Sequence, residues 1–286
     1  MFAVTAITGK VGGALATALL DAGLPVRAIV RNAAKGERWA ARGCEVAVAD
    51  ADDALSLARA LEAAEGAFLL LPPVFDPVPG FADSRTRIAA FREALLQARP
   101  SRVVVLSTIG ADADRPNLLN ALRLLEEGLA DVDLPITFLR AAWFMENAAW
   151  DVVSARDEGV IRSYLQPLDR PIAMISARDV GRTAAALLQE EWAGHRVVEL
   201  EAARRVSPDD IAAAFSTALG RPVRAEAVPR DQWEAIFRAQ GMTNPLPRMQ
   251  MLDGFNEGWI AFGQPGTIVR RGRIGIDEAV AGLLKL

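Results

Sequence analysis

Three small residues near the start of the chain have the spacing of a phosphate-binding loop. Ala6, Gly9 and Gly12 lie between a short apolar segment and the helical pattern Gly13-Ala-Leu-Ala-Thr-Ala-Leu-Leu. Backbone N–H groups at a helix N-terminus have no partner within the helix, and the helix dipole adds partial positive charge there. Glycine also lets the backbone approach phosphates closely. The pattern therefore predicts a dinucleotide pyrophosphate site formed by Ala6, Thr8, Gly9, Lys10, Val11 and Gly12.

Two cations bear on which dinucleotide this loop binds. NAD sites place an Asp or Glu at the end of the second strand, where it accepts hydrogen bonds from the adenosine ribose. Between Ala22 and Gly36 the chain has no acidic residue, and Arg31 and Lys35 stand there instead. Such cations suit a 2′-phosphate. The alternative interpretation is that they only solvate a surface helix. We expect NADP(H) as the cofactor.

Residues at the ends of later strands complete the candidate cofactor site. In a doubly wound sheet the carboxyl ends of the strands line the ligand crevice. Leu71 and Pro72 end one expected strand, and Ser107 and Thr108 end the next. Asp50 follows an earlier strand, where it can meet the adenine edge or cap the helix that follows. We assign Thr108 to catalysis and the others to cofactor binding.

The chain has the alternation of strands and helices that would bring these residues together. Apolar strand patterns occupy residues 26–30, 44–49, 66–71, 102–107 and 135–139, with helical patterns between them. This alternation predicts parallel strands with right-handed crossovers. The expected fold is α/β, a doubly wound parallel (Rossmann-type) sheet with a smaller C-terminal substrate lobe. We divide it into residues 1–141, which bind NADP(H), and 142–286, of which about 177–200 returns to the sheet.

Aromatic residues gather in the expected C-terminal lobe and could frame a flat substrate. Trp143, Phe144, Tyr164 and Trp233 are the substrate-binding candidates. The alternative is that each of them packs in the core. Asn147 is polar beside an apolar block, and its amide could bond a nicotinamide or substrate carbonyl. We assign Asn147, with Thr108, to catalysis.

Histidine, tyrosine and lysine, which many mechanisms use to move protons, are scarce. The chain has one histidine (His195), one tyrosine (Tyr164) and three lysines (Lys10, Lys35 and Lys285). A mechanism that needs a His–Asp pair, a Cys/His cluster or a Tyr–Lys pair has few places for it. His195 precedes a strand and is expected in a surface turn. We expect no metal site.

Composition and charge exclude several classes of protein. Of the 286 residues, 51% are hydrophobic and 24% charged, the balance of a soluble globular protein. The net charge of 32 − 36 = −4 does not favour nucleic-acid binding. No apolar run approaches the roughly 20 residues of a membrane helix, and the chain lacks a signal-peptide pattern at its start. The single cysteine, Cys44, indicates a reducing compartment, so we expect a cytoplasmic protein.

Several sequence blocks together resemble the NmrA-like family of atypical short-chain dehydrogenase/reductase relatives. The blocks are Val-Thr-Ala-Ile-Thr-Gly-Lys-Val-Gly (4–12), Ala-Ile-Val-Arg-Asn (28–32), Phe-Leu-Leu-Leu-Pro-Pro (68–73), Val-Leu-Ser-Thr-Ile-Gly-Ala (105–111), Leu-Arg-Ala-Ala-Trp-Phe-Met-Glu-Asn (139–147) and Ala-Arg-Asp-Val-Gly (177–181). The resemblance implies NADP(H) binding. It also implies either a quinone or dye reductase or an NADP-sensing regulator.

The chain departs from the family pattern at residues that matter for mechanism. Ala6 and Ala141-Ala142 stand where the resemblance implies a glycine and Pro-Gly. The Tyr-x-x-x-Lys pair of ordinary short-chain dehydrogenases is missing, because Leu168 follows Tyr164 at that spacing. The reductase branch often has His or Lys four residues before a glutamate that matches Glu126, which puts Leu122 there. Glu126 and Glu127 are expected on a helix surface.

Two functions from different classes remain. The first is an NADPH-dependent oxidoreductase that transfers hydride to a flat electrophilic acceptor, such as a quinone or dye, without a Tyr–Lys acid pair. The second is a non-catalytic NADP(H) sensor that binds a protein partner. Epimerase or dehydratase chemistry is disfavoured without the Tyr–Lys pair. We favour the reductase, with a small aromatic substrate and no nucleic-acid or membrane partner, and leave the oligomeric state open.

Overall fold

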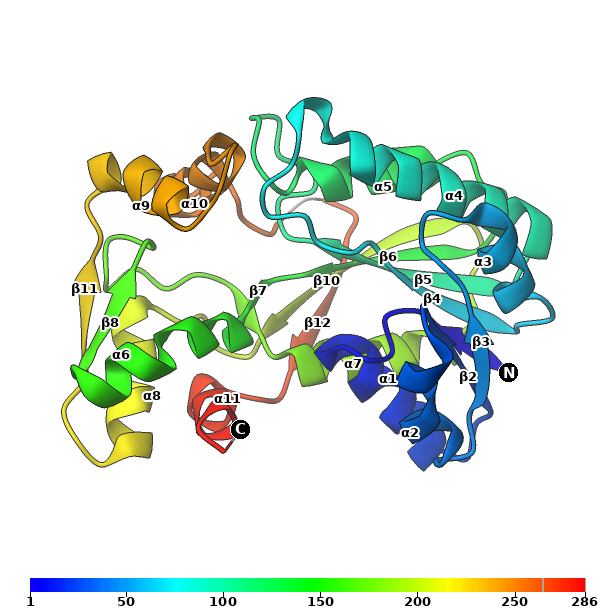
Figure 1. The fold of residues 1–286 in the computed structure, drawn as a ribbon, viewed down its shortest axis with the longest axis horizontal. Coiled ribbons are helices and arrows are strands. Elements are labelled where there is room, and N and C mark those ends of the chain that lie inside the picture. Colours follow the sequence, from blue (N-terminus) through cyan, green and yellow to red (C-terminus); the bar gives the residue numbers. More distant parts are fainter. Residues whose placement is uncertain (264, 286) are drawn as a thin grey trace.

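A parallel sheet with helices on both faces forms the larger part of the molecule, and a smaller lobe lies beside it (Figure 1). The computed structural model describes residues 1–263 and 265–285. Within these residues the main sheet has eight strands, and all of its neighbouring pairs are parallel. The predicted α/β doubly wound fold is confirmed.

The order of the strands places a ligand crevice near the start of the chain. In sequence order the strands of this sheet are β1 (Phe2–Val4), β2 (Val26–Val30), β3 (Glu45–Val48), β4 (Gly66–Leu70), β5 (Arg102–Thr108), β6 (Ile136–Ala141), β10 (His195–Ala202) and β12 (Ile268–Gly272). Across the sheet they run β12-β10-β6-β5-β4-β1-β2-β3. The chain extends the sheet from β1 toward β3 and then crosses to β4 and continues in the opposite direction. Ligands bind at such a switch point, beyond the carboxyl ends of the strands.

Alternating side chains bury the two faces of the sheet against different helices. Val103 and Val105 of β5 point into one core, and Val104 and Leu106 point into the other. The first face packs on α3 (Ala54–Leu61), α4 (Ala82–Ala98) and α5 (Asn120–Leu129), and the second on α1 (Lys10–Asp21) and α7 (Ala177–Leu187). Gly181 lets α7 approach α1, because a Cβ there would lie 2.6 Å from the backbone of Leu15.

The smaller lobe is built from residues that follow β6. Its elements are β7 (Trp143–Phe144), η3 (Met145–Asp151), α6 (Val152–Asp157), β8 (Val160–Ser163), β9 (Met174–Ile175), α8 (Pro208–Leu219), β11 (Arg224–Ala227), η4 (Arg230–Gln232), α9 (Trp233–Ala239), α10 (Leu246–Glu257) and α11 (Ile276–Leu283). Phe215 and Phe237 are fully buried there and join the same core as α1 and α7. The two parts therefore share one continuous hydrophobic core.

Most predicted elements are present, with two informative differences. Between the strands expected at 26–30 and 44–49, the helical pattern forms a 3-10 turn, η1 (Ala33–Gly36), followed by the short α2 (Glu37–Ala40). Asn32 caps η1 through a hydrogen bond from the N–H of Ala34. The edge strand β12 was not predicted, because its side chains are mostly exposed and show no apolar alternation. The strand expected near 197–200 does return to the sheet, as β10 beside β6. The proposed division of domains at residue 141 stays a prediction.

Candidate cofactor and acceptor site

The loop after β1 presents the N-terminus of α1 to a ligand. Gly9 is the N-cap residue, and no side chain accepts a hydrogen bond from the first turn of the helix. A Cβ on Gly12 would lie 2.4 Å from the carbonyl oxygen of Ala6, so only glycine fits against this loop. Ala6 has φ of 49°, in the left-handed region that favours glycine. The tight turn and the open amides fit a dinucleotide pyrophosphate.

Three cations surround this loop, one of which the sequence analysis missed. Arg31 and Lys35 are exposed, and their side chains make no hydrogen bond or ion pair within residues 1–263 and 265–285. The guanidinium of Arg38 donates to the carbonyl oxygen of Thr8 at 3.1 Å and lies over the Trp39 ring. Its only sequence signal is its place one turn after Lys35. All three are available to a phosphate on the adenosine side.

Asp50 occupies the loop after β3 but does not cap the next helix. Its Oδ1 accepts a hydrogen bond from the N–H of Asp52 at 3.1 Å. The cap of α3 is Asp53, whose carboxylate accepts from the N–H groups of Leu55 and Ser56. The exposed carboxylate of Asp50 keeps one oxygen without a hydrogen bond from the described residues.

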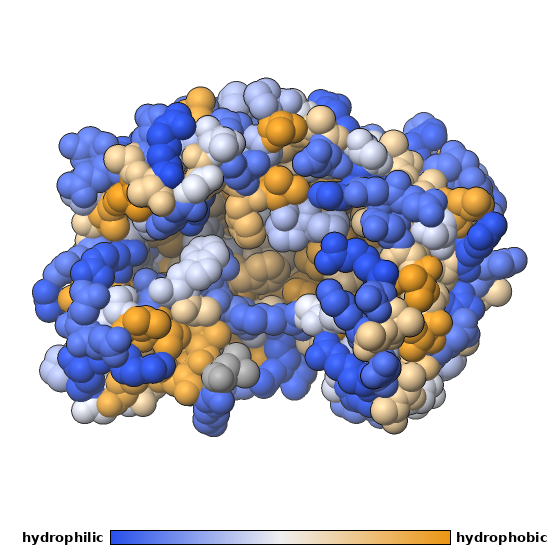
Figure 2. All heavy atoms as spheres, viewed as in Figure 1, coloured by the Kyte–Doolittle hydropathy of each residue, from blue (hydrophilic) through white to orange (hydrophobic). Residues whose placement is uncertain are grey.

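A cavity of about 410 Å³ opens beside the carboxyl ends of β4, β5 and β6. Figure 2 shows it as a hollow in the middle of the face, with apolar side chains at its floor and hydrophilic ones around it. Predicted site residues from both parts of the chain line it: Val11, Leu71, Pro72, Ser107, Thr108, Trp143, Phe144, Asn147 and Tyr164. Val11 belongs to the first turn of α1, so the cavity adjoins the phosphate-binding loop.

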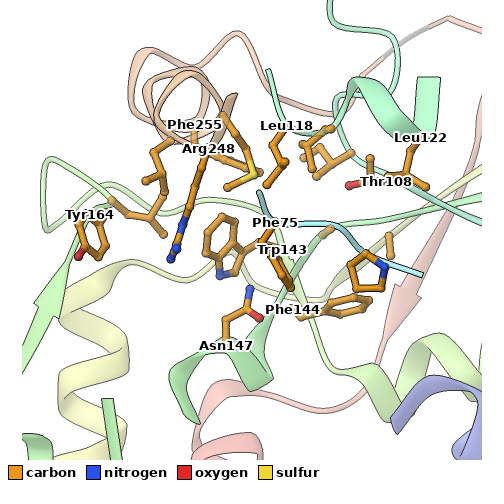
Figure 3. Close-up of a pocket in the computed structure, with 18 of the residues that line it drawn as sticks. Phe75, Thr108, Leu118, Leu122, Trp143, Phe144, Asn147, Tyr164, Arg248 and Phe255 are labelled. Atoms are coloured by element: carbon orange, nitrogen blue, oxygen red, sulfur yellow. The ribbon is translucent and has the colours of Figure 1, made fainter. Parts of the chain in front are cut away.

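Two of the predicted site residues at the cavity have polar side chains without a partner among the described residues. The hydroxyl of Thr108 and the amide of Asn147 make no hydrogen bond with any residue of 1–263 or 265–285. Figure 3 shows Leu122 beside Thr108, at the position where the family resemblance implied His or Lys. Both free groups can therefore bond a ligand, and Leu122 supplies no proton there.

Unlike the hydroxyl of Thr108, the hydroxyl of Ser107 is hydrogen-bonded to a carboxylate of a buried ion pair. Ser107 Oγ donates to Glu126 Oε1 at 2.5 Å, and Arg140 donates to both oxygens of Glu126 at 2.9 and 2.7 Å. Arg140 also bonds Asp112 at 2.8 Å. The Glu126 side chain is 13% exposed, so its expected surface position is wrong, whereas Glu127 is exposed as expected. The sequence could not show this, because the partner Arg140 lies on a distant strand.

The far end of the cavity is formed by Tyr164, well separated from Thr108 (Figure 3). The Tyr164 ring packs edge-on against Trp233, with centroids 5.7 Å apart, and at a tilt of 37° against Phe237, with centroids 5.0 Å apart. Burial raises the pKa of Tyr164. Trp233 does not line the cavity: it is 1% exposed, and its indole N–H donates to the carbonyl of Val228. Trp233 supports Tyr164 from the core.

One face of α10 covers the cavity, which sequence reasoning did not find. Its lining residues Arg248, Met251, Leu252 and Phe255 follow the i, i+3, i+4, i+7 spacing of a helix face. Phe255 packs edge-on against Trp143, with ring centroids 5.1 Å apart. That spacing was the available signal, but it becomes meaningful only once Trp143 is known to lie opposite.

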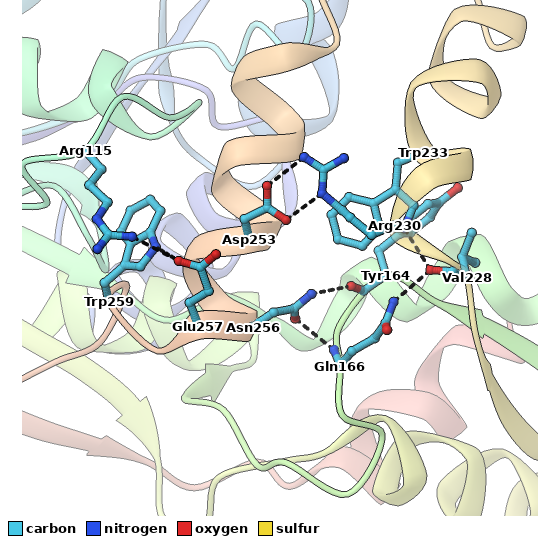
Figure 4. A network of polar contacts seen from close by, with 10 residues as sticks. All are labelled: Arg115, Tyr164, Gln166, Val228, Arg230, Trp233, Asp253, Asn256, Glu257 and Trp259. Atoms are coloured by element: carbon cyan, nitrogen blue, oxygen red, sulfur yellow. Dashed lines mark hydrogen bonds and ion pairs between the residues drawn. The ribbon is translucent and has the colours of Figure 1, made fainter.

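Another face of α10 ties the helix to the rest of the protein (Figure 4). Asp253 forms a bidentate ion pair with Arg230, with N–O distances of 2.7 and 2.8 Å. Asn256 donates to the carbonyl of Tyr164 and accepts from the N–H of Gln166. Glu257 pairs with Arg115, which precedes α5. These contacts fix the cavity-lining face in position.

The loop after β4 holds the segment before α10 through a single carboxylate. Asp76 accepts hydrogen bonds from the N–H and hydroxyl of Thr243 at 2.8 and 2.9 Å and from the N–H of Asn244 at 2.7 Å. These bonds, led by the one from the Thr243 backbone, lower the pKa of Asp76. The loop after β4 is thus hydrogen-bonded to the segment that leads into α10, the helix that covers the cavity.

His195 lies outside the site. It is exposed at the start of β10, where its Nε2 is 2.9 Å from the carbonyl oxygen of Val132 and its ring packs edge-on against Phe138. Within the described residues, no three His, Cys, Asp or Glu side chains are grouped so that they could hold a metal ion. No helix in this part of the chain is both long and apolar enough to cross a membrane.

Comparison with known proteins assigns the fold to a family. The sequence model of the NmrA-like family matches residues 1–258. The chain belongs to this family. The predicted resemblance is thereby confirmed, and with it a NAD(P)-binding oxidoreductase fold.

Among NmrA-like and related proteins, the chain is similar to several reductases. It is 30% identical over 257 residues to an NAD(P)H azoreductase of Xenophilus azovorans, covering 86% of this chain and 83% of that protein. It is 30% identical over 242 residues to the (4-alkanoyl-5-oxo-2,5-dihydrofuran-3-yl)methyl phosphate reductase of Streptomyces griseus, covering 84% and 81%. The crystal structure of the NADPH complex of an Escherichia coli NADPH-dependent quinone oxidoreductase superimposes with a TM-score of 0.81 at 24% identity, covering 99% and 100% of the two chains.

Proposed function

We propose that this protein is an NADPH-dependent oxidoreductase that transfers hydride to a flat electrophilic acceptor such as a quinone or dye. The observation that carries the proposal is that the Thr108 hydroxyl and the Asn147 amide line the same cavity. These two unpartnered polar groups lie in a largely apolar cavity that adjoins the phosphate-binding loop. The site has no Tyr–Lys pair, so the chemistry it supports best needs little acid catalysis.

The cavity residues have separate roles in this proposal. When bound, NADPH supplies the hydride, and a quinone that takes this hydride and one proton from water becomes a hydroquinone, leaving NADP⁺. Trp143 and Phe144 hold the flat acceptor against the nicotinamide face, and the apolar wall excludes water. The Asn147 amide donates to a carbonyl oxygen on which negative charge develops, and Thr108 offers a second donor.

The relatives support both the cofactor class and the reaction class. An NAD(P)H azoreductase and an NADPH-dependent quinone oxidoreductase use this fold. In this chain the absence of an acidic residue after β2 and the free cations Arg31 and Lys35 favour the phosphorylated dinucleotide.

The test is NADPH consumption by the purified protein against quinones and azo or triarylmethane dyes, with NADH in parallel. We expect turnover with NADPH and much less with NADH. Asn147→Ala should lower kcat/KM by about 100-fold or more, the cost of one oxyanion donor. Gln97→Ala, which alters an exposed amide on α4 outside the cavity, is the control. NADPH binding without turnover of any acceptor would overturn the proposal and favour the NADP(H) sensor.

A further inference from the structure

Arg248 is a charged side chain in largely apolar surroundings, and it faces the acceptor cavity (Figure 3). Its guanidinium carbon lies 4.3 Å from the centroid of the Phe237 ring and 5.7 Å from that of Trp150. Nη1 donates to the sulfur of Met242 at 3.6 Å. These contacts hold the cation in place, but its other N–H donors have no acceptor among residues 1–263 and 265–285.

No carboxylate neutralises Arg248. Within residues 1–263 and 265–285, no Asp or Glu oxygen lies within 4.0 Å of its guanidinium nitrogens. Asp151 and Arg162 line the same cavity, but Arg162 pairs with Glu158, and Asp151 forms no ion pair. Most other arginines that the protein partly buries, such as Arg140, are paired with carboxylates. Arg248 is therefore an exception among the described residues.

The unpaired donors of Arg248 are open to the cavity. In the described part of the chain, the only fully buried side-chain polar atoms without a partner are the indole nitrogens of Trp39 and Trp192. The guanidinium N–H groups are not among them, so they keep some exposure, and Arg248 lines both this cavity and a neighbouring hollow beside Asp151 and Gln240. Burial nevertheless lowers the pKa of Arg248, which reflects the cost of removing this cation from water.

We propose that Arg248 recognises an oxyanion group on the acceptor, so that the substrate is a conjugated molecule carrying a carboxylate, sulfonate or phosphate. A planar guanidinium binds such groups through two parallel hydrogen bonds, and the partly desolvated cavity strengthens them. Thr108 and Leu122 lie at one end of the cavity, and Arg248 lies toward Tyr164 at the other (Figure 3). The conjugated part then lies beside Trp143, with the anion held away from the reacting carbon.

The assignment of the ligand as a hydride acceptor rests on the proposed function. The proposal of an oxyanion site at Arg248 does not depend on it. The first experiment therefore measures binding without turnover. Calorimetric titration of the protein saturated with NADP⁺ compares naphthalene-2-sulfonate with the neutral naphthalene-2-sulfonamide, which has a similar shape. Saturation with NADP⁺ keeps the anion out of the dinucleotide site. We expect the sulfonate to bind at least about tenfold more tightly.

Arg248→Met keeps an unbranched apolar stem and removes the charged guanidinium. It should abolish the preference for the sulfonate and change the affinity for the sulfonamide by less than about twofold, and Arg248→Lys should retain part of the preference. Arg238→Met, which alters an exposed arginine on α9 paired with Glu234, is the matched control. Equal binding of both ligands to the wild type, or an equal loss of both in Arg248→Met, would overturn the proposal and leave Arg248 a packing role.

A second experiment separates this proposal from the proposed function. Initial rates with 1,4-naphthoquinone-2-sulfonate and with 2-methyl-1,4-naphthoquinone are compared in the same variants. Arg248→Met should raise KM for the sulfonate at least about tenfold and leave the neutral quinone within about twofold. If neither quinone is reduced by the wild type but sulfonate binding depends on Arg248, the oxidoreductase assignment fails while the oxyanion site stands.

Discussion

At the scale of single residues, the phosphate-binding loop depends on backbone conformation as much as on side chains. Ala6 adopts a positive φ, and Gly12 must lack a Cβ because the carbonyl of Ala6 lies against it. The two positions are therefore coupled, since the backbone conformation of Ala6 sets the space available at Gly12. Ala6 has a Cβ and Gly12 has none, so the steric strain of the left-handed conformation falls on Ala6.

Ala6→Gly is expected to raise the free energy of unfolding by about 0.5–1 kcal/mol, because glycine adopts the left-handed region without steric strain. Urea unfolding measures the change. Ala213→Gly, at an exposed position inside α8, should instead lower it by about 1 kcal/mol. A loss of stability in both variants would show that Ala6 is not strained.

Arg31→Ala is expected to weaken NADPH binding by about 1–3 kcal/mol, the scale of a charged hydrogen bond, and to leave NADH nearly unchanged. Dissociation constants for both dinucleotides measure the difference. Arg204→Ala, on the other lobe, provides the control for loss of a surface charge. An equal loss for NADPH and NADH would mean that Arg31 does not contact the 2′-phosphate.

Asp151 makes stability depend on pH. Burial raises its pKa from the ordinary 3.8 to about 6, so the folded protein holds this proton more tightly than the unfolded chain does. The resulting stability is complete below about pH 4 and is lost as pH rises through 6. Asp151→Asn removes the buried charge and should stabilise the protein at pH 8 by up to about 3 kcal/mol, but only slightly at pH 4.

Urea unfolding at both pH values tests this expectation. The control is Asp157→Asn at an exposed position of α6, which should change stability by less than about 0.5 kcal/mol at either pH. A stabilisation by Asp151→Asn of the same size at pH 4 and pH 8 would rule out titration of Asp151 as its cause.

At the scale of elements, α5, β5 and β6 are joined by polar contacts beneath the cavity. Arg140 of β6 and Glu126 of α5 are only 10% and 13% exposed, and Ser107 of β5 bonds the same carboxylate. This cluster fixes the end of β5 and thereby the position of Thr108. Its charges are costly to bury singly but stable together.

Glu126→Gln is expected to lower the free energy of unfolding by about 3 kcal/mol, because it leaves Arg140 partly uncompensated. Glu127→Gln, one residue along the same helix, removes an exposed pair with Arg123 and should cost less than about 0.5 kcal/mol. Denaturant unfolding of the two variants gives the comparison. Similar losses would contradict the burial of the Glu126–Arg140 pair.

The elements also show what could be predicted from sequence and what could not. The central strands were predictable because both of their faces are buried, so each is a continuous apolar run such as Phe68-Leu-Leu-Leu. The phosphate loop was predictable because its chemistry lies in adjacent residues. Contacts between residues distant in sequence were not predictable, which is why Glu126 was misplaced and neither Arg248 nor Phe255 was assigned to the site.

At the scale of the whole molecule, the two parts are not independent units. The C-terminal half of the chain contributes β10 and β12 to the main sheet, and Leu15 of α1 shares a core with Phe215 of α8. We therefore expect a single cooperative unfolding transition, in which tryptophan fluorescence and far-ultraviolet circular dichroism change together. Two separated transitions would instead support the division at residue 141 as an independent domain boundary.

Two different faces of α10 line the cavity and anchor the helix. Arg248, Met251, Leu252 and Phe255 shape the cavity, whereas Asp253, Asn256 and Glu257 anchor the helix. Substitutions in the first set can change the shape and charge of the cavity without loosening the second set. Mutation and selection can therefore change which molecules the cavity admits through one face of a single helix, while the loop after β1 and the scaffold stay as they are.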